Sequence, residues 1–380
     1  MTLESEFPGL AMRAAFRYPE KRPASGSGVS IPNPQIEQSG KNLTERYLHV
    51  RSRSVALCES LSPEDMTVQS MPDVSPAKWH LAHVTWFFER FVLQPHERGY
   101  TVYNENFDHL FNSYYFTVGQ MHQRPRRGLL SRPGGAEFLR YREHVERAMT
   151  VVLEQADGNL SFRVMLGLNH EQQHQELILT DIKHVLAQNP TLPAYASATE
   201  SGEVVGPLAW TSFPGGVAEI GTNSTSGPGE GFVYDNETPR HRVWLEPFEI
   251  ADRPVSNGEF RAFIEDGGYE RSELWLSDGW TQVREEGWRH PLYWADDLQR
   301  SFTLGGELPL DRHAPVCHLS YFEADAYARW AAEQMPGVRL PTEAEWEIAA
   351  RDLPLQGHFA DAGVFQPQGA AGEGLRQVYG

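Results

Sequence analysis

The chain has 380 residues, of which 40% are hydrophobic and 11% aromatic, and 33 Lys and Arg against 51 Asp and Glu give a formal net charge of −18. This composition is typical of a globular protein with two sizeable cores, and the acidic excess argues against a nucleic-acid partner, which needs a basic face. No apolar run approaches the about 20 residues of a membrane span, and two distant cysteines, Cys58 and Cys317, indicate no disulfide framework, so we expect a cytoplasmic protein with reduced thiols.

The first part of the chain predicts an extension followed by a helical bundle. Residues 1–42 mix Pro, Gly, Ser and scattered charges without a period, which is typical of a flexible extension. Helical periodicity then predicts four helices, over residues 43–61, 75–91, 135–156 and 160–186. Four such helices form a bundle over residues 43–188, in which facing helices can build a metal site. Residues 189–207, rich in Pro, Ala, Ser, Thr and Gly, are the predicted linker.

The second predicted helix carries two histidines. His83 shares a strongly apolar stripe with Phe87 and Phe91, four and eight residues further on, whereas His80 precedes it by three residues and could equally face inward. A single histidine on such a stripe is more often a hydrogen-bonded core residue than a metal ligand. This helix by itself therefore indicates no site.

Two polar features follow in the connection to the third helix. Tyr114 and Tyr115 form a pair that is either a packing element or, because a phenol stays protonated near pH 7, a proton donor. Residues 123–133 gather arginines in an otherwise acidic protein. This run is either a solvated loop or a clamp for the carboxylate of an amino-acid substrate, which a guanidinium binds in bidentate fashion.

The fourth predicted helix contains the pattern His-Glu-x-x-His. His170 and His174 lie on one helical face and can bind one metal ion. The same pattern is the zincin signature, in which Glu171 would activate a zinc-bound water, although the extended form with a Gly and a third His is absent. A chance pairing of histidines is the third interpretation, and His184 is expected as a surface or cap residue near the helix end.

The second half of the chain is rich in Gly and Pro, with short predicted strands and helical patterns confined to residues 257–266, 321–333 and 343–351. Three segments stand out in it, namely Tyr-Asp-Asn-Glu-Thr-Pro-Arg-His (residues 234–241), Pro-Val-Ser-Asn-Gly-Glu-Phe (254–260) and Arg-Leu-Pro-Thr-Glu-Ala-Glu-Trp-Glu (339–347). We expect these segments to hold a loop-rich fold together.

In their order along the chain, the His83 helix, the Phe-Asn-Ser-Tyr-Tyr segment of residues 111–115 and the His170/His174 helix resemble the sulfoxide synthases of ergothioneine biosynthesis. The three later segments are similar to landmarks of the formylglycine-generating-enzyme-like fold, and the last is the most specific. The resemblance covers about residues 43–380. It implies a multidomain α and α+β protein, in which a DinB-like four-helix bundle precedes a loop-rich, C-type-lectin-like domain over residues 208–380.

The resemblance also implies a chemistry. Family members hold one non-haem Fe(II) with three histidines, which by motif are His83, His170 and His174 here, with His80 left out. They join the thiol of cysteine or gamma-glutamylcysteine to the imidazole ring of hercynine, using dioxygen, and yield a sulfoxide. Ovothiol-type and selenoneine-type synthases share the scaffold, and a zinc-dependent hydrolase is the less favoured alternative.

Further roles carried over by motif concern the substrates. One residue of the Tyr114/Tyr115 pair is expected to donate a proton, Arg124 and Arg127 to contact the carboxylate of the sulfur donor, and Gln173 to contact the imidazole substrate. The family continues beyond Gly380 with an Asp-Val-Trp-Glu-Trp-Thr-like segment. We therefore expect the C-terminal part of the second domain to be missing here, with an incomplete cleft and an exposed apolar surface near Trp346.

Overall fold

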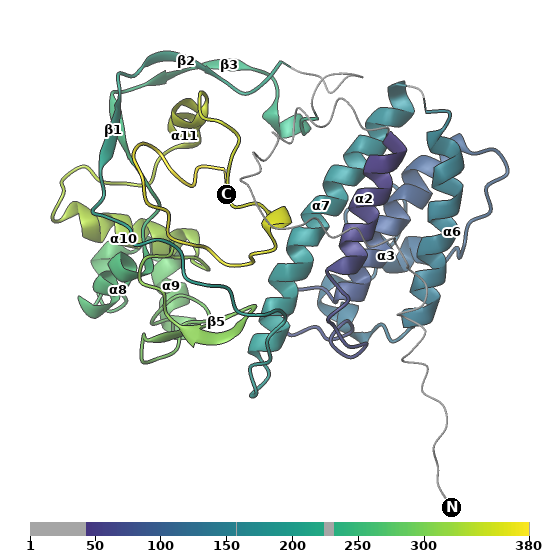
Figure 1. The fold of residues 1–380 in the computed structure, drawn as a ribbon, viewed down its shortest axis with the longest axis horizontal. Coiled ribbons are helices and arrows are strands. Elements are labelled where there is room, and N and C mark those ends of the chain that lie inside the picture. Colours follow the sequence, from purple (N-terminus) through teal and green to yellow (C-terminus); the bar gives the residue numbers. More distant parts are fainter. Residues whose placement is uncertain (1–42, 157, 224–231, 380) are drawn as a thin grey trace, which may run out of the picture.

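The computed structural model describes residues 43–156, 158–223 and 232–379 (Figure 1). The extension predicted for residues 1–42 lies outside the described residues. A helical bundle and a loop-rich domain lie side by side, and α7 is the bundle helix nearest to the second domain (Figure 1). None of the helices in the described ranges is both long and apolar enough to cross a membrane.

The bundle contains the four predicted helices, and α3 is its central element. The main helices are α2 (Leu43–Ala56), α3 (Ala77–Phe88), α6 (Gly135–Leu153) and α7 (Gly158–Ala187), joined by the short elements η2 (Glu89–Leu93, π-helical), α4 (Gln94–His96), α5 (Phe107–Phe111) and η3 (Arg124–Leu129). Every residue of α3 is buried. A helix that is apolar nearly all round packs against neighbours on every side, so both of its histidines face protein.

Gly167 brings α3 and α7 close together. A Cβ atom at this position would lie 2.6 Å from the ring of Phe88. Glycine is therefore required for the close approach of the two helices, despite its unfavourable helix propensity. The contact lies one turn before His170, so it sets the distance between the two helices at the level of the histidines.

In the described part of the second domain, the regular elements are short antiparallel strand pairs and four α-helices. The pairs are β1 (Trp210–Phe213) with β4 (Phe248–Ala251), β2 (Gly216–Ile220) with β3 (His241–Leu245), and β5 (Arg300–Thr303) with β6 (Gly306–Pro309). The helices are α8 (Asn257–Glu265), α9 (Ser277–Glu286), α10 (Tyr321–Ala332) and α11 (Glu343–Ala350), with the 3-10 turns η4 (Asp235–Glu237), η5 (Ser272–Leu274) and η6 (Ala360–Ala362).

Two of the family-like segments act as helix caps. Ser256 and Glu259 form a capping box at the start of α8, and Thr342 and Glu345 form another at the start of α11. In each box the hydroxyl accepts from the backbone of the Glu, and the Glu carboxylate accepts from the backbone of the cap residue. These residues hold the fold, as expected.

The prediction that helical pattern is confined to three segments of this domain is wrong, because α9 is a fourth helix. Its buried residues are only Gly279 and Val283, so it has no apolar stripe that a periodicity argument could detect. Tertiary packing holds it, since a Cβ atom at Gly279 would lie 2.6 Å from Phe322. The first bundle helix was also predicted too long, because after Ala56 the chain forms turns rather than helix.

The C-terminal part of α7 joins the two domains. Ile182 and Leu186 belong to the same buried cluster as Phe302 and Leu304 of the β5–β6 region. Lys183 Nζ lies 2.6 Å from His318 Nε2. Helix α7, which carries His170 and His174, thus packs against both the helical bundle and the second domain.

His184 was expected as a surface or cap residue near the end of its helix. It lies in the last turn of α7 but is buried, and its Nδ1 lies 2.6 Å from Ser70 Oγ, so the prediction of a surface position is wrong. The physical reason is that the second domain covers the end of α7, where the ring of Tyr293 lies 6.4 Å from that of His184.

An exposed apolar surface was expected near Trp346. This residue of α11 is 41% exposed, and its ring lies 6.1 Å from that of Tyr379.

Candidate metal centre

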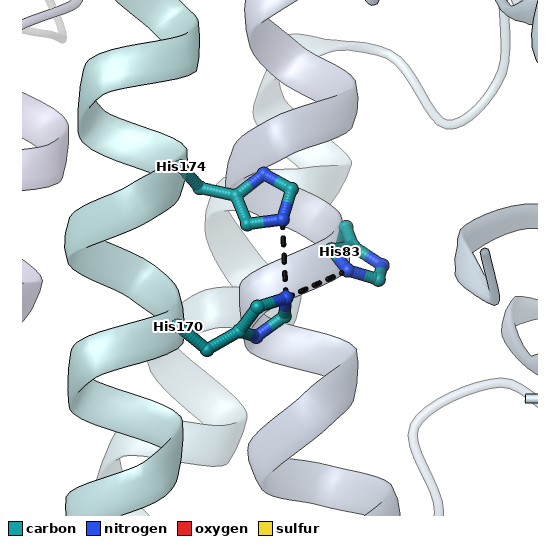
Figure 2. A group of neighbouring side chains, drawn as sticks. All are labelled: His83, His170 and His174. Atoms are coloured by element: carbon teal, nitrogen blue, oxygen red, sulfur yellow. Dashed lines mark hydrogen bonds between the residues drawn. The ribbon is translucent and has the colours of Figure 1, made fainter. Parts of the chain in front are cut away.

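Three histidines from two helices converge on one point (Figure 2). His83 comes from α3, and His170 and His174 from successive turns of α7. The Nε2 atom of His170 lies 3.3 Å from that of His83 and 3.1 Å from that of His174. One nitrogen of each ring lies within 4.8 Å of the others, and no other such group of three or more metal-binding side chains occurs in the described ranges.

In two of the three rings, a contact of Nδ1 on the far side leaves Nε2 facing this point. His83 Nδ1 lies 2.5 Å from the carbonyl oxygen of Phe111. A carbonyl only accepts, so Nδ1 of His83 carries the proton and Nε2 presents its lone pair. His174 Nδ1 contacts another imidazole, that of His80. Nδ1 of His170 is buried and makes no hydrogen bond with a described residue.

Burial keeps these imidazoles neutral. It lowers the pKa of His83 and of His174 well below the usual value, and the neighbouring imidazoles reinforce this effect. Burial also lowers the pKa of His170 to about 4. One nitrogen of each of these neutral imidazoles meets the others in a buried space, and imidazole nitrogen suits iron, zinc, copper and nickel. The donor set therefore fits one divalent transition-metal ion.

Aromatic rings surround the three histidines. The Trp79 ring stacks on His83 with 4.7 Å between centroids and an interplanar angle of 11°. Phe87 lies 5.1 Å from the His170 ring, between centroids, and Phe91 lies 5.1 Å from Phe87. This apolar wall excludes water on one side of the site and limits the rotation of the imidazoles.

Glu171 does not belong to the histidine cluster. Its carboxylate is fully buried, and it accepts from Arg51 Nη1 and Arg142 Nη2, both at 2.9 Å, and from Ser54 Oγ at 2.7 Å. Burial alone would raise the pKa of Glu171, but the two guanidinium groups and the hydroxyl lower it to about 2. A carboxylate engaged in this way is not free to activate a metal-bound water, which disfavours the zincin interpretation.

Arg127 is buried beside the cluster. Its guanidinium lies over the Trp79 ring, 3.4 Å from the centroid, and donates to Ser75 Oγ at 2.8 Å and Ser113 Oγ at 2.9 Å. Burial, together with the charge of Arg124, lowers the pKa of Arg127 to about 10. Its hydrogen-bond partners in the described part of the chain are neutral hydroxyl groups, and its Nε atom has no hydrogen-bond partner there.

The structure separates the two tyrosines. Tyr115 is half-buried, with its ring centroid 4.6 Å from that of Phe91 and 5.8 Å from that of Trp86, and burial raises its pKa. Tyr114 is 71% exposed, and its hydroxyl accepts from Arg124 Nη1 at 3.4 Å. Gln173 is exposed on α7, one turn after His170.

Sequence reasoning missed the polar residues that support the histidines. The partners of Glu171 include Arg51, which lies 120 residues away, and His80 lies between His174 and Asp181 instead of joining the group of three. The available signal was the presence of several charged residues on otherwise apolar helices, where a buried charge requires a partner. The identity of each partner depends on how the helices pack.

Comparisons with known proteins cover both domains. Residues 46–178 match the DinB superfamily, and residues 206–375 match the sulfatase-modifying factor enzyme 1-like domain. These matches confirm the predicted order of a DinB-like bundle and a formylglycine-generating-enzyme-like domain.

The chain is also similar to individual proteins. It is 32% identical over 324 residues to the hercynine oxygenase of Mycolicibacterium smegmatis, covering 83% of this chain and 70% of that protein. It is 31% identical over 338 residues to the hercynine oxygenase of Mycolicibacterium thermoresistibile, covering 87% and 69%. The formylglycine-generating enzyme of Streptomyces coelicolor is 35% identical over 185 residues, covering 42% and 53%. By overall identity and by both domains, the chain belongs to the hercynine oxygenase family.

Proposed function

We propose that this protein is a non-haem Fe(II)-dependent sulfoxide synthase, which joins a cysteine-type thiol to the imidazole ring of hercynine with dioxygen in ergothioneine biosynthesis. The convergence of His83, His170 and His174 in a chain 32% identical to a hercynine oxygenase carries this proposal. These three histidines would hold the iron. When bound, Fe(II) supplies open coordination positions and the redox chemistry for the reaction of the thiol with dioxygen.

Arg127 is the proposed anchor for the carboxylate of the thiol substrate. This guanidinium is buried and its side-chain hydrogen bonds go to hydroxyl groups, so an incoming carboxylate would supply a charged partner that it does not hydrogen bond to in the described residues. Ser75 and Ser113 fix its orientation, and the Trp79 ring supports its face. Arg124 is a second, exposed cation in the same run, suited to contact the substrate from outside.

Tyr115 is the proposed proton donor of the tyrosine pair. Its raised pKa keeps the phenol protonated at neutral pH, and its ring packs on the aromatic wall around the histidines. Tyr114 is mostly in solvent and lacks that packing. Gln173, one turn after His170, is the proposed contact for the imidazole ring of hercynine, because its amide can both donate and accept.

Product analysis tests the function. The Fe(II)-loaded protein is given hercynine, either cysteine or gamma-glutamylcysteine, and dioxygen, and a sulfoxide with a new carbon–sulfur bond is expected by mass spectrometry. Free histidine in place of hercynine tests the ovothiol-type alternative, and selenium donors test the selenoneine-type one. The proposal fails if iron-loaded protein forms no such product while zinc-loaded protein hydrolyses peptides.

A further inference from the structure

A chain of buried polar side chains leads away from the metal centre behind His174. His80 Nδ1 lies 2.7 Å from His174 Nδ1, and His80 Nε2 lies 3.0 Å from Asp181 Oδ2. All three residues are buried, with His80 only 3% exposed. His80 thus contacts His174, a proposed metal ligand, but does not itself belong to the group of three histidines that could bind the metal.

The chemistry of the partners fixes the direction of each hydrogen bond. Oδ2 of Asp181 also accepts from the backbone N–H of Ser75 at 2.7 Å, so this atom is an acceptor. His80 must therefore donate from Nε2, and a neutral imidazole protonated there has only a lone pair at Nδ1. It follows that His174 donates from its Nδ1, and that its Nε2 presents a lone pair to the metal site.

We infer that His80 is a positioning residue, which together with Asp181 fixes the tautomer and the ring orientation of His174 for metal binding. The inference rests on the three-histidine site of the proposed function. Each proposed ligand is supported differently, since His83 uses the carbonyl of Phe111 and His170 has no Nδ1 partner in the described residues. His174 is the ligand that is tied to a carboxylate, through a second imidazole.

A positioning role has a measurable energetic consequence. Partners that orient metal-binding histidines typically contribute about 10 to 100-fold to metal affinity. The competing explanation is that His80 and Asp181 only tie α3 to α7, as the hydrogen bond from Ser75, just before α3, to Asp181 also does. That explanation predicts a loss of folding stability without a change in the metal affinity of the folded protein.

Two substitutions at His80 separate these explanations. His80→Leu removes the acceptor for His174, whereas His80→Asn keeps a carbonyl oxygen close to the position of Nδ1. The metal-free full chain would be titrated anaerobically with Fe(II), and with Co(II) for its absorption spectrum, against a competing chelator. The unfolding midpoint of each variant, measured without metal, reports the structural contribution.

We expect His80→Leu to bind metal about 10 to 100-fold more weakly than the unsubstituted chain and to alter the Co(II) spectrum, and His80→Asn to recover most of the affinity. Equal affinity in all three proteins would overturn the inference and leave the proposed function intact. Absence of metal binding by the unsubstituted chain would instead overturn the proposed function.

Nitrogen-15 NMR of histidine-labelled, zinc-loaded protein tests the hydrogen-bond directions without any substitution. The expected result is a proton on Nε2 of His80 and on Nδ1 of His174. A proton on Nδ1 of His80 would contradict the inference, even if His80→Leu did not fold. Asp181→Asn, which keeps an acceptor but removes the charge, should bind metal with an affinity between those of the unsubstituted chain and His80→Leu.

Discussion

Glu171 Oε2 accepts from Arg51 Nη1 at 2.9 Å, in an ion pair with both side chains almost completely removed from solvent. Glu171 directly follows His170, so the Glu of the His-Glu-x-x-His pattern belongs to the support of the helix bundle and not to the metal centre. Adjacent helical residues point about 100° apart. The same five-residue pattern can therefore serve a hydrolase or a purely structural charge cluster.

Substitution of Glu171 by Gln should destabilise the protein. The change leaves the buried guanidinium groups of Arg51 and Arg142 without the negative charge of Glu171. Loss of one partner of a buried ion pair typically costs about 3–5 kcal/mol in the free energy of unfolding. Denaturant unfolding would measure it, with Glu176→Gln as the control on the exposed face of the same helix. A hydrolase would behave differently, losing peptide hydrolysis while keeping most of its stability.

His83→Ala should remove the iron. Two imidazoles on one helix then remain, and the stoichiometric Fe(II) content and the anaerobic nitrosyl signal of the reconstituted protein should both be lost. His144→Ala is the matched control, because the His144 side chain hydrogen bonds to the carbonyl of Thr101 and does not belong to the group of three. Retention of full iron by His83→Ala would show that the third ligand lies elsewhere.

Arg127→Ala should impair use of the thiol substrate. Hydrogen bonds to charged groups contribute about 1.5–3 kcal/mol, so the KM for cysteine or gamma-glutamylcysteine should rise by about 10 to 100-fold, while that for hercynine changes little. Arg126→Ala alters an exposed neighbour and should leave both values unchanged. Arg127→Lys should not restore binding, because an ammonium cannot make the bidentate contact or stack on Trp79 in the same way. Equal effects on both substrates would argue against a carboxylate anchor.

Tyr115→Phe should lower kcat and Tyr114→Phe should not. Loss of a proton donor typically costs about 10² to 10⁴-fold in rate, whereas the exposed Tyr114 contributes one long hydrogen bond to Arg124. Steady-state sulfoxide formation and total thiol consumption should be followed together, because unproductive oxidation would otherwise mask the defect. A larger effect at Tyr114 would reverse the assignment.

The metal-free protein should lose stability as the pH falls below about 6.5. The folded pKa of His170, about 4, lies below that of the unfolded chain, so between these values the unfolded state binds more protons. Stability is complete above this window and falls through it by up to about 1.4 kcal/mol per pH unit for each such histidine. Urea unfolding from pH 7.5 to 4.5 would measure the slope, and His170→Gln should reduce it; a slope unaffected by His170→Gln would contradict the assignment.

The local features of this protein could be predicted from its sequence. Periodicity located the four bundle helices, and the i and i+4 spacing placed His170 and His174 on one face, because helix geometry is a property of neighbouring residues. The capping boxes of the second domain are local in the same sense. Helix α9 escaped prediction because its burial depends on Phe322, which is distant in the sequence.

Only the tertiary structure decided how the α3 histidines are used. Because α3 is buried on every side, its apolar pattern does not distinguish His83 from His80, and the family motif alone favoured His83. In the folded chain His83 faces the pair on α7, while His80 joins His174 to Asp181. The sequence by itself determined which side chains share a helix face. The packing of α3 against α7, made close by Gly167, determined which of these side chains meet. Contacts between two helices depend on the rotation of each helix about its axis and on the distance between the axes, which no local sequence pattern specifies.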